Sequence, residues 1–290
     1  MDKGRFAGSA ALLGSAFLWA TGYIAVKQLV NDISPGFLLA LRFTMATVIL
    51  LVLLAPKLKK INRGMLGAGI RMGLALFFEF YFFTTGVQHT TASKSSFIIA
   101  SYIILLPIAY IIIRRKRPQK SEVLAALMCM AGLCLIMADN LNGFNIGDLL
   151  SCFCAVAYAV HVVYAAKYAK EYDGSLLNLI QIGTSAVMAW IFSFVMGDVQ
   201  TGFADIPFWA IVYLAVICTI IPYFLCLFGM KYVSTTTSGI LLSFESVFAT
   251  ILAVIMLNES LYWQLIAGGA IIISSCLVSE LLPARLKKKE

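Results

Sequence analysis

Long apolar runs, each long enough to cross a bilayer, follow one another along almost the whole chain. A helix of about 20 apolar residues spans a hydrocarbon core of about 30 Å, whereas each strand of a membrane β-barrel alternates polar and apolar residues over about ten positions. The runs show no such alternation. The sequence therefore predicts ten membrane-spanning helices, at approximately residues 6–29, 35–55, 65–86, 92–113, 121–138, 147–168, 175–196, 206–228, 237–257 and 261–282.

The amino-acid composition excludes a water-soluble fold. Of the 290 residues, 61% are hydrophobic and 12% are charged, whereas soluble domains are about half apolar and about a quarter charged. Lys3 and Arg5 precede the first run as basic residues precede a signal peptide. That run is too long for a signal peptide and lacks a cleavage site, so we interpret it as a retained span. We expect an all-α polytopic protein of the cell (plasma or inner) membrane.

The seven cysteines all fall within predicted spans, at positions 129, 134, 152, 154, 218, 226 and 276. Metal or redox chemistry is one use for such residues, and the other is as buried structural thiols, which we favour. Cys152 and Cys154 are two positions apart, so they point to different faces of a helix. We expect no metal and no cofactor.

The net charge is +8, and basic and acidic residues alternate between successive connections, as in a membrane protein. With the N-terminus in the cytoplasm, basic residues occupy the cytoplasmic ends and connections: Lys3, Arg5, Lys57, Lys59, Lys60, Arg63, Arg114, Arg115, Lys116, Arg117, Lys120, Lys167, Lys170, Lys231, Arg285, Lys287, Lys288 and Lys289. The opposite connections carry acids: Asp32, Asp139, Asp148, Asp198, Asp205 and Glu259. This pattern follows the positive-inside rule and predicts that both termini are cytoplasmic. It indicates no nucleic-acid partner.

The two halves of the chain resemble each other. "TGVQHTTASKSSFIIASYIILLPI" (85–108) aligns with "FGMKYVSTTTSGILLSFESVFATI" (228–251) at a constant offset, and "WATGYIAVKQL" (19–29) aligns with "YAVHVVYAAKY" (158–168). Long apolar helices can look alike by chance, but we favour a duplication, with repeats at 1–139 and 140–290. Because five spans per repeat is an odd number, the second repeat is inverted, an arrangement typical of secondary transporters with a site near the midplane.

Several segments of the second half carry motifs of a known family: a stretch rich in small residues before the ninth span, "E-x-V-F" from Glu245 to Phe248, "N-E-S-L" at 258–261 and "Q-L-I-A-G-G" at 264–269. With "TTASKSSFIIASYIILLPIAY" (90–110), they resemble the EamA-type transporters of the drug/metabolite transporter superfamily along nearly the whole chain. The chain departs from the family pattern in having Ser246 where proline is usual, a basic "RRKRP" after the fourth span, and Glu79 in the third span.

The resemblance implies ten spans in two inverted repeats and an alternating-access carrier of small metabolites. Such carriers usually export amino acids or amphipathic compounds, so we expect export of amino acids or amphipathic, cationic solutes, with protons as the candidate coupling ion. The chain contains no G-x-x-x-x-G-K-[ST] nucleotide-binding motif. No pattern indicates an oligomeric state.

Four ionisable residues lie well inside predicted spans, where a charge costs about 2.5–3.5 kcal/mol or more and therefore needs a partner or a role. At a rise of about 1.5 Å per residue, Arg42 and Glu79 lie roughly 10 Å below the outer surface, and His161 and Glu245 a similar depth above the inner one. Matching depths predict the pairs Arg42–Glu79 and His161–Glu245. Because histidine titrates near neutral pH, the second pair is a candidate proton site.

Structural roles are the alternative for each of these groups. Arg42–Glu79 can be a static tie between helices, Glu245 can hydrogen-bond a serine or a backbone group, and His161 can be a satisfied core residue. Three further cations near span ends, Lys27, Arg71 and Lys94, are expected to extend their charged ends to the surface.

Aromatic residues at similar depths are candidate walls of a binding pocket, because tyrosine and tryptophan combine an apolar ring with a polar atom and attract cations. They are Trp19, Tyr23, Tyr102, Tyr158 and Tyr223. The repeat offset pairs Tyr102 with Glu245. Packing is the alternative role for each. Pro107 and Pro222 are candidate hinges since each removes a helix hydrogen bond, and Gly69-x-x-x-Gly73 predicts a close helix contact.

Two other classes of function compete with a transporter. An intramembrane enzyme would need catalytic residues, but the chain has no H-E-x-x-H, no G-x-S-x-G and no pair of aspartates within spans. A channel or a structural membrane protein would need neither an inverted repeat nor buried charge pairs. We therefore expect a small-molecule carrier.

Overall fold

The computed structural model describes residues 3–106, 144–199, 207–233 and 235–286, together with a few positions between 108 and 135. All regular secondary structure in these ranges is helical. The elements are α1 (Lys3–Leu29), α2 (Pro35–Leu54), a 3-10 helix (Ala55–Lys60), α3 (Arg63–His89), α4 (Ala92–Ala100), α7 (Ile146–Tyr168), α8 (Gly174–Met196), α9 (Phe208–Ala215), a π-helical turn (Val216–Ile220), α10 (Ile221–Tyr232), α11 (Thr235–Leu257) and α12 (Trp263–Leu286).

Six of the helices are long and apolar enough to cross a membrane: Gly4–Leu29, Pro35–Lys60, Arg63–His89, Ile146–Tyr168, Gly174–Met196 and Phe208–Tyr232. Three shorter apolar helices cover Ala92–Leu106, Leu241–Leu257 and Trp263–Ser275. The prediction of a helical multi-pass membrane protein is therefore confirmed. Most of the fifth predicted span (121–138) lies outside the described residues, so the count of ten spans stays a prediction.

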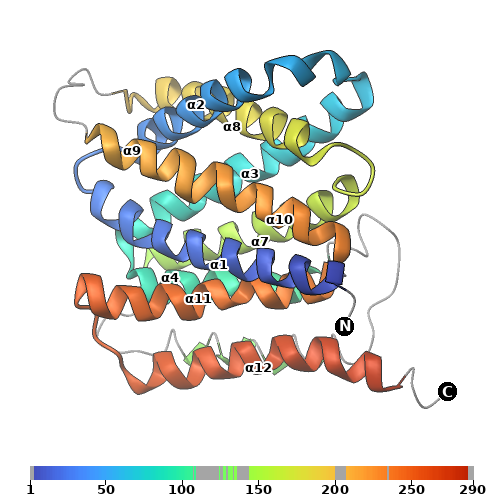
Figure 1. Ribbon diagram of the computed structural model, residues 1–290. Coiled ribbons are helices and arrows are strands. Elements are labelled where there is room, and N and C mark those ends of the chain that lie inside the picture. The colour runs from blue at the N-terminus through green and yellow to red at the C-terminus, as the bar shows by residue number, and fades with distance from the viewer. Residues whose placement is uncertain are drawn as a thin grey trace.

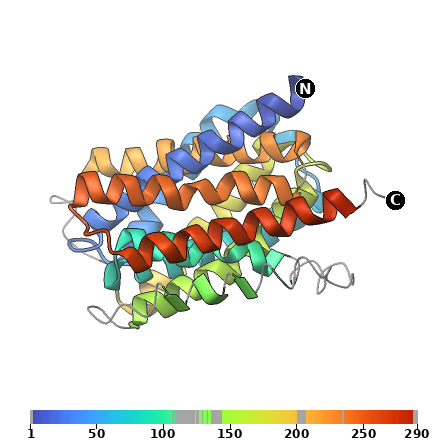
Figure 2. The same ribbon diagram turned by 90° about the horizontal axis from the view of Figure 1, so that it is seen from below.

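The most extensive helix packing joins the first half of the chain to the second. Helix α3 packs along α7 and α8, α2 along α8, α1 along α10 and α11, and α4 against α7 and α11. Figure 1 shows α2, α10, α1, α11 and α12 one below another with their long axes running across the view, and Figure 2 shows the bundle from the side of α12. The two halves thus form one interleaved core, while their inverted relationship and the cytoplasmic termini stay predictions.

Helices α3 and α8 approach closely at two glycines. A Cβ at Gly73 would lie 2.5 Å from the Cβ of Thr184, and a Cβ at Gly69 would collide with Ile180. The absence of both side chains lets the hydroxyl of Ser185 donate to the carbonyl of Gly73 at 2.9 Å. The close contact predicted from Gly69-x-x-x-Gly73 is therefore confirmed.

The helix from α9 to α10 changes its winding at Val216–Ile220, where a π-helical turn precedes Pro222. Proline has no N–H, so the carbonyl of Cys218, four residues earlier, loses its helical donor. The carbonyl of Pro222 itself accepts a hydrogen bond of 2.8 Å from Ser15 of α1. The helix is thus irregular next to Pro222, while its role as a hinge stays a prediction, and Pro107 lies outside the described residues.

The cysteines divide by location. Cys154, Cys218 and Cys226 are buried, Cys152 is half-buried, and Cys134 is exposed. The first three are buried as expected, whereas Cys134 is exposed among the described residues, and a structural role for the thiols stays a prediction. Cys129 and the side chain of Cys276 lie outside the described part of the chain.

Candidate functional site

A small cavity lies between the two halves of the chain. Helices α1, α2, α3, α4, α7 and α11 all contribute to its wall. Six of the predicted site residues line it, together with five residues that were not predicted as site residues. The lining residues are Trp19, Gly22, Tyr23, Arg42, Glu79, Phe80, Phe83, Ile99, Cys154, Tyr158 and Glu245.

Glu79 of α3 forms an ion pair with His161 of α7. Its Oε2 lies 2.9 Å from the Nδ1 of His161, and both side chains are at most 9% exposed. The contact does not have the geometry of an aligned hydrogen bond, and neither atom has another hydrogen-bond partner among the described residues. The second carboxylate oxygen, Oε1, accepts a hydrogen bond of 3.3 Å from the hydroxyl of Tyr223. Glu79 is therefore at the cavity wall but already held by two partners.

Two amides on α8 hold the other side of the histidine ring. The Nε2 of His161 lies 3.0 Å from the Oε1 of Gln181, and the Nε2 of Gln181 donates to the Oδ1 of Asn178 at 2.6 Å. All three side chains are buried. Because an amide oxygen only accepts, this orientation of Gln181 assigns a proton to the Nε2 of His161.

Arg42 of α2 is buried, and it fills the gap that Pro222 leaves in the neighbouring helix. Its Nη2 donates to the carbonyl of Cys218 and its Nε to the hydroxyl of Thr219, each at 2.7 Å. The guanidinium also lies over the ring of Phe80, 4.5 Å from the centroid. The third nitrogen, Nη1, has no hydrogen bond to any residue that the structure describes.

Glu245 of α11 has no cationic partner. The hydroxyls of Tyr23 and Tyr158 face its carboxylate, and no lysine, arginine or histidine in the described ranges forms an ion pair with it. It also lines a second, smaller cavity, which reaches Tyr102, Ser96 and Ser243. The Glu245 carboxylate therefore lines both cavities.

The predicted pairs Arg42–Glu79 and His161–Glu245 are wrong, because Glu79 pairs with His161 instead. The depth of a residue in the membrane gives its position along the membrane normal. It does not determine which neighbouring helix the side chain faces. Helix α3 packs closely along α7, which brings Glu79 to His161, and Arg42 turns to the kink in the neighbouring helix.

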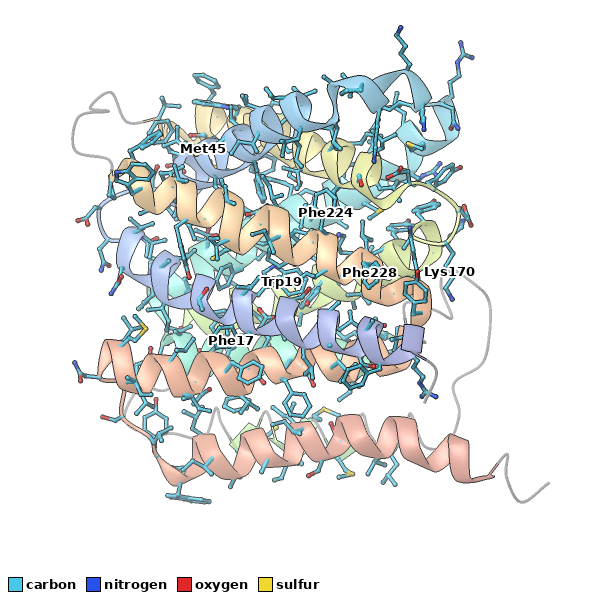
Figure 3. All side chains as sticks on the ribbon, viewed as in Figure 1. Phe17, Trp19, Met45, Lys170, Phe224 and Phe228 are labelled. Carbon is cyan, nitrogen blue, oxygen red and sulfur yellow. The ribbon has the colours of Figure 1, made fainter. Side chains whose placement is uncertain are left out.

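Aromatic rings surround these polar groups. The ring of Trp19 lies 5.0 Å from that of Tyr223 and 6.2 Å from that of Tyr158, and Tyr23 contacts Phe83. Figure 3 shows Trp19 about midway along α1. The Nε1 of Trp19 is buried with no hydrogen-bond partner among the described residues. An unpaired indole donor in a cavity wall is available to a bound solute.

Two of the predicted aromatics serve the surrounding structure. Tyr102 stacks on Tyr158 at 4.1 Å between ring centroids and donates to the carbonyl of Gly239 at 2.9 Å. Tyr223 packs edge-on against His161 at 5.6 Å. Both therefore lie behind the main cavity wall, where they hold residues that face the cavity.

One end of the bundle, on the predicted outer side, is held by a buried polar network that the sequence did not predict. The Nζ of Lys94 lies 2.8 Å from the Oδ2 of Asp148, and both are almost fully buried. Thr90 donates to the same carboxylate at 2.8 Å. Glu259 accepts hydrogen bonds from the backbone of Ala92 and Ser93 at the start of α4. These contacts tie the two halves together at this end.

Of the three cations expected to reach the surface, Lys94 does not, and Lys27 is half-buried with its charged end bound to backbone. Lys94 is buried against Asp148, and the Nζ of Lys27 donates to the carbonyls of Val87 and Thr90, each at 2.7 Å. Arg71 is exposed, as expected, and bonds the hydroxyl of Tyr168 at 3.2 Å. The prediction failed because carbonyls at the end of α3 and a buried carboxylate supply closer partners than the surface does.

Comparison with known proteins identifies relatives of the chain. A model of the EamA-like transporter family matches residues 6–138 and 145–280. An uncharacterized transporter of Archaeoglobus fulgidus is 25% identical over 257 residues, covering 85% of this chain and 77% of the relative. The uncharacterized transporter YetK of Bacillus subtilis is 24% identical over 306 residues, covering 98% and 86%. A crystal structure of a protein 19% identical in sequence has the same fold, with a TM-score of 0.71 over 96% of this chain and 98% of the other.

Proposed function

The chain belongs to the EamA-like transporter family, and we propose that it is a secondary active transporter of small amphipathic solutes bearing a cationic group, such as amino acids or organic amines. Alternating access around the central cavity moves the solute, with export the favoured direction and protons the coupling ion. Membership of the family and the names of the relatives support membrane transport.

The observation that carries the substrate class is the Glu245 carboxylate. It lies at a buried cavity, and no cation in the described ranges pairs with it. A charge in such a place is costly unless it is neutralised, and a solute ammonium would neutralise it. The rings of Trp19, Tyr23 and Tyr158 provide apolar and cation-attracting walls.

Arg42 adds a second recognition element for zwitterionic solutes. Its Nε and Nη2 are occupied by the kinked helix, which fixes the guanidinium while Nη1 has no partner among the described residues. A carboxylate on the solute would meet Nη1 and the indole N–H of Trp19. Amino acids therefore offer a partner to both Glu245 and Arg42, and simple amines to Glu245 alone.

Solute counterflow in proteoliposomes tests this function. Vesicles loaded with an unlabelled amino acid, amine or nucleobase are diluted into the labelled compound, and a carrier gives a transient accumulation above equilibrium. The panel is first scored by thermal shift in detergent. Equilibration without accumulation would indicate a channel, and conversion of the compound would indicate an intramembrane enzyme. Either result would overturn the proposal.

A further inference from the structure

The two carboxylates at the cavity have different surroundings. Glu79 is held by the imidazole of His161 at 2.9 Å and by the hydroxyl of Tyr223 at 3.3 Å. Glu245 faces tyrosine hydroxyls and has no ion-pair partner among the described residues. Because Glu79 already has a cationic partner in His161 and Glu245 has none among the described residues, we expect the two carboxylates to bind different ligands.

The contact between Glu79 and His161 requires a proton. Gln181 assigns a hydrogen to the Nε2 of His161. The contact between Nδ1 and Oε2 therefore needs a second proton, carried either by the imidazole as a cation or by the carboxyl group as a neutral acid. If that proton leaves, a nitrogen lone pair and a carboxylate oxygen face each other at 2.9 Å. Their repulsion would open the contact.

Other titratable groups face Glu79 from five of the helices around it. They are Tyr23 of α1, Arg42 of α2, Cys154, Tyr158 and His161 of α7, Tyr223 and Cys226 of α10, and Glu245 of α11. Tyrosines and cysteines are neutral near pH 7. The charges that act on Glu79 are therefore Arg42, His161 and Glu245, and Arg42 is fixed by its bonds to Cys218 and Thr219.

Loss of the shared proton would make the cavity more negative by one charge. With the proton in place, the charges of Glu79 and Glu245 are matched by those of His161 and Arg42. Without it, Glu79 is released from His161 and faces the cavity beside Glu245. A solute cation would then be attracted more strongly, and the return of the proton would weaken that attraction.

We propose that the two carboxylates divide the transport cycle between them: the Glu79–His161 pair takes up and releases the coupling proton, and Glu245 binds the cationic group of the solute. This inference rests on the proposed function. The proton and the cationic group of the solute then occupy the same cavity in turn, each bound by a different carboxylate. Transport becomes an exchange in which the solute cation is released as the Glu79–His161 pair regains its proton.

Binding of phenethylamine, an amphipathic primary ammonium, tests the solute half of the division by calorimetry in detergent. The uncharged 2-phenylethanol is the matched control ligand. From pH about 5 to about 8, where histidine changes charge, wild-type affinity for phenethylamine should rise about tenfold or more.

The E79Q variant should bind phenethylamine at every pH as weakly as the wild type does at low pH, and E245Q should weaken binding about thirtyfold or more. E171Q, on an exposed glutamate, is the matched control and should behave as wild type.

Infrared difference spectra of the same variants test the proton half with no solute present. The pH-dependent signal of the shared proton, which comes from the carboxyl group or from the imidazole ring, should be lost or change its midpoint in both E79Q and H161Q, and persist in E245Q. Thermal unfolding shows that each variant is folded. Loss of the signal in E245Q with its retention in E79Q would overturn the assignment, as would failure of the wild type to prefer phenethylamine over 2-phenylethanol.

The two proposals fail in different ways. Counterflow by the wild type together with a pH signal that E245Q removes would retain the transporter and overturn the division of roles. A signal confined to the Glu79–His161 pair, without counterflow of any solute in the panel, would overturn the transporter.

Discussion

The Nδ1 of His161 and the Oε2 of Glu79 lie 2.9 Å apart at the wall of the central cavity, joining α7 to α3. This contact connects the fold to its proposed use. It crosses from one half of the chain to the other, it excludes Glu79 from the solute while it is closed, and it depends on one proton. The same geometry predicts how its partners affect stability.

Removing only the histidine should destabilise the protein strongly. H161F leaves the Glu79 carboxylate buried with Tyr223 as its remaining partner, and breaking a buried pair in this way costs about 3–5 kcal/mol. In the double variant E79L/H161F no buried charge is left unpaired, so most of the loss should be recovered. Thermal unfolding in detergent measures both. Additive losses in the double variant would show that the pair contributes nothing.

Arg42 and Pro222 should be energetically coupled. In R42K the lysine cannot reach both the carbonyl of Cys218 and the hydroxyl of Thr219, so the loss should be about 1.5–3 kcal/mol for each charged hydrogen bond broken. P222A restores a backbone N–H to the same turn. The loss caused by R42K should therefore be smaller in the P222A background than in wild type, as a double-mutant cycle of unfolding temperatures would reveal. Equal losses in the two backgrounds would argue against the coupling.

Two glycines of α3 give a matched test of the contact with α8. G73A would bring a methyl group to 2.5 Å from the Cβ of Thr184 and 2.6 Å from the carbonyl of Gln181, whereas Gly67 has open space. Overpacking of this kind costs about 1–3 kcal/mol, while G67A should be neutral or slightly stabilising because alanine favours helices. G73A should also disturb the bond between Gln181 and His161. The contact would be refuted if both variants unfolded alike.

The buried ion pair Lys94–Asp148 should contribute strongly to the stability of the protein. K94M leaves the Asp148 carboxylate without its cation, at a cost of about 3–5 kcal/mol. The control K170M removes an exposed lysine, which Figure 3 shows at the edge of the bundle, and should change stability little. Protein yield and unfolding temperature in detergent compare the two. A K94M variant as stable as K170M would contradict the structure.

The helical spans, the family and most of the cavity-lining residues could be predicted from the sequence, since apolar length and buried charge follow directly from the cost of polar groups in lipid. The partners could not. The depth of a residue follows from its position in a helix. The residue that its side chain contacts depends on how α3 packs against α7, and the local sequence does not determine that packing. One signal was available: Pro222 leaves the carbonyl of Cys218 without a donor, and a buried arginine is a natural replacement.

The most direct measurement is solute counterflow by wild type, E245Q and E171Q in matched proteoliposomes, using whichever cationic or zwitterionic compound the wild type accumulates. Glu245 faces the cavity without an ion-pair partner in the described ranges, so its neutral variant should lose the accumulation while remaining folded. E171Q, altered at an exposed position, should retain it. Accumulation by E245Q equal to that of wild type would contradict the account.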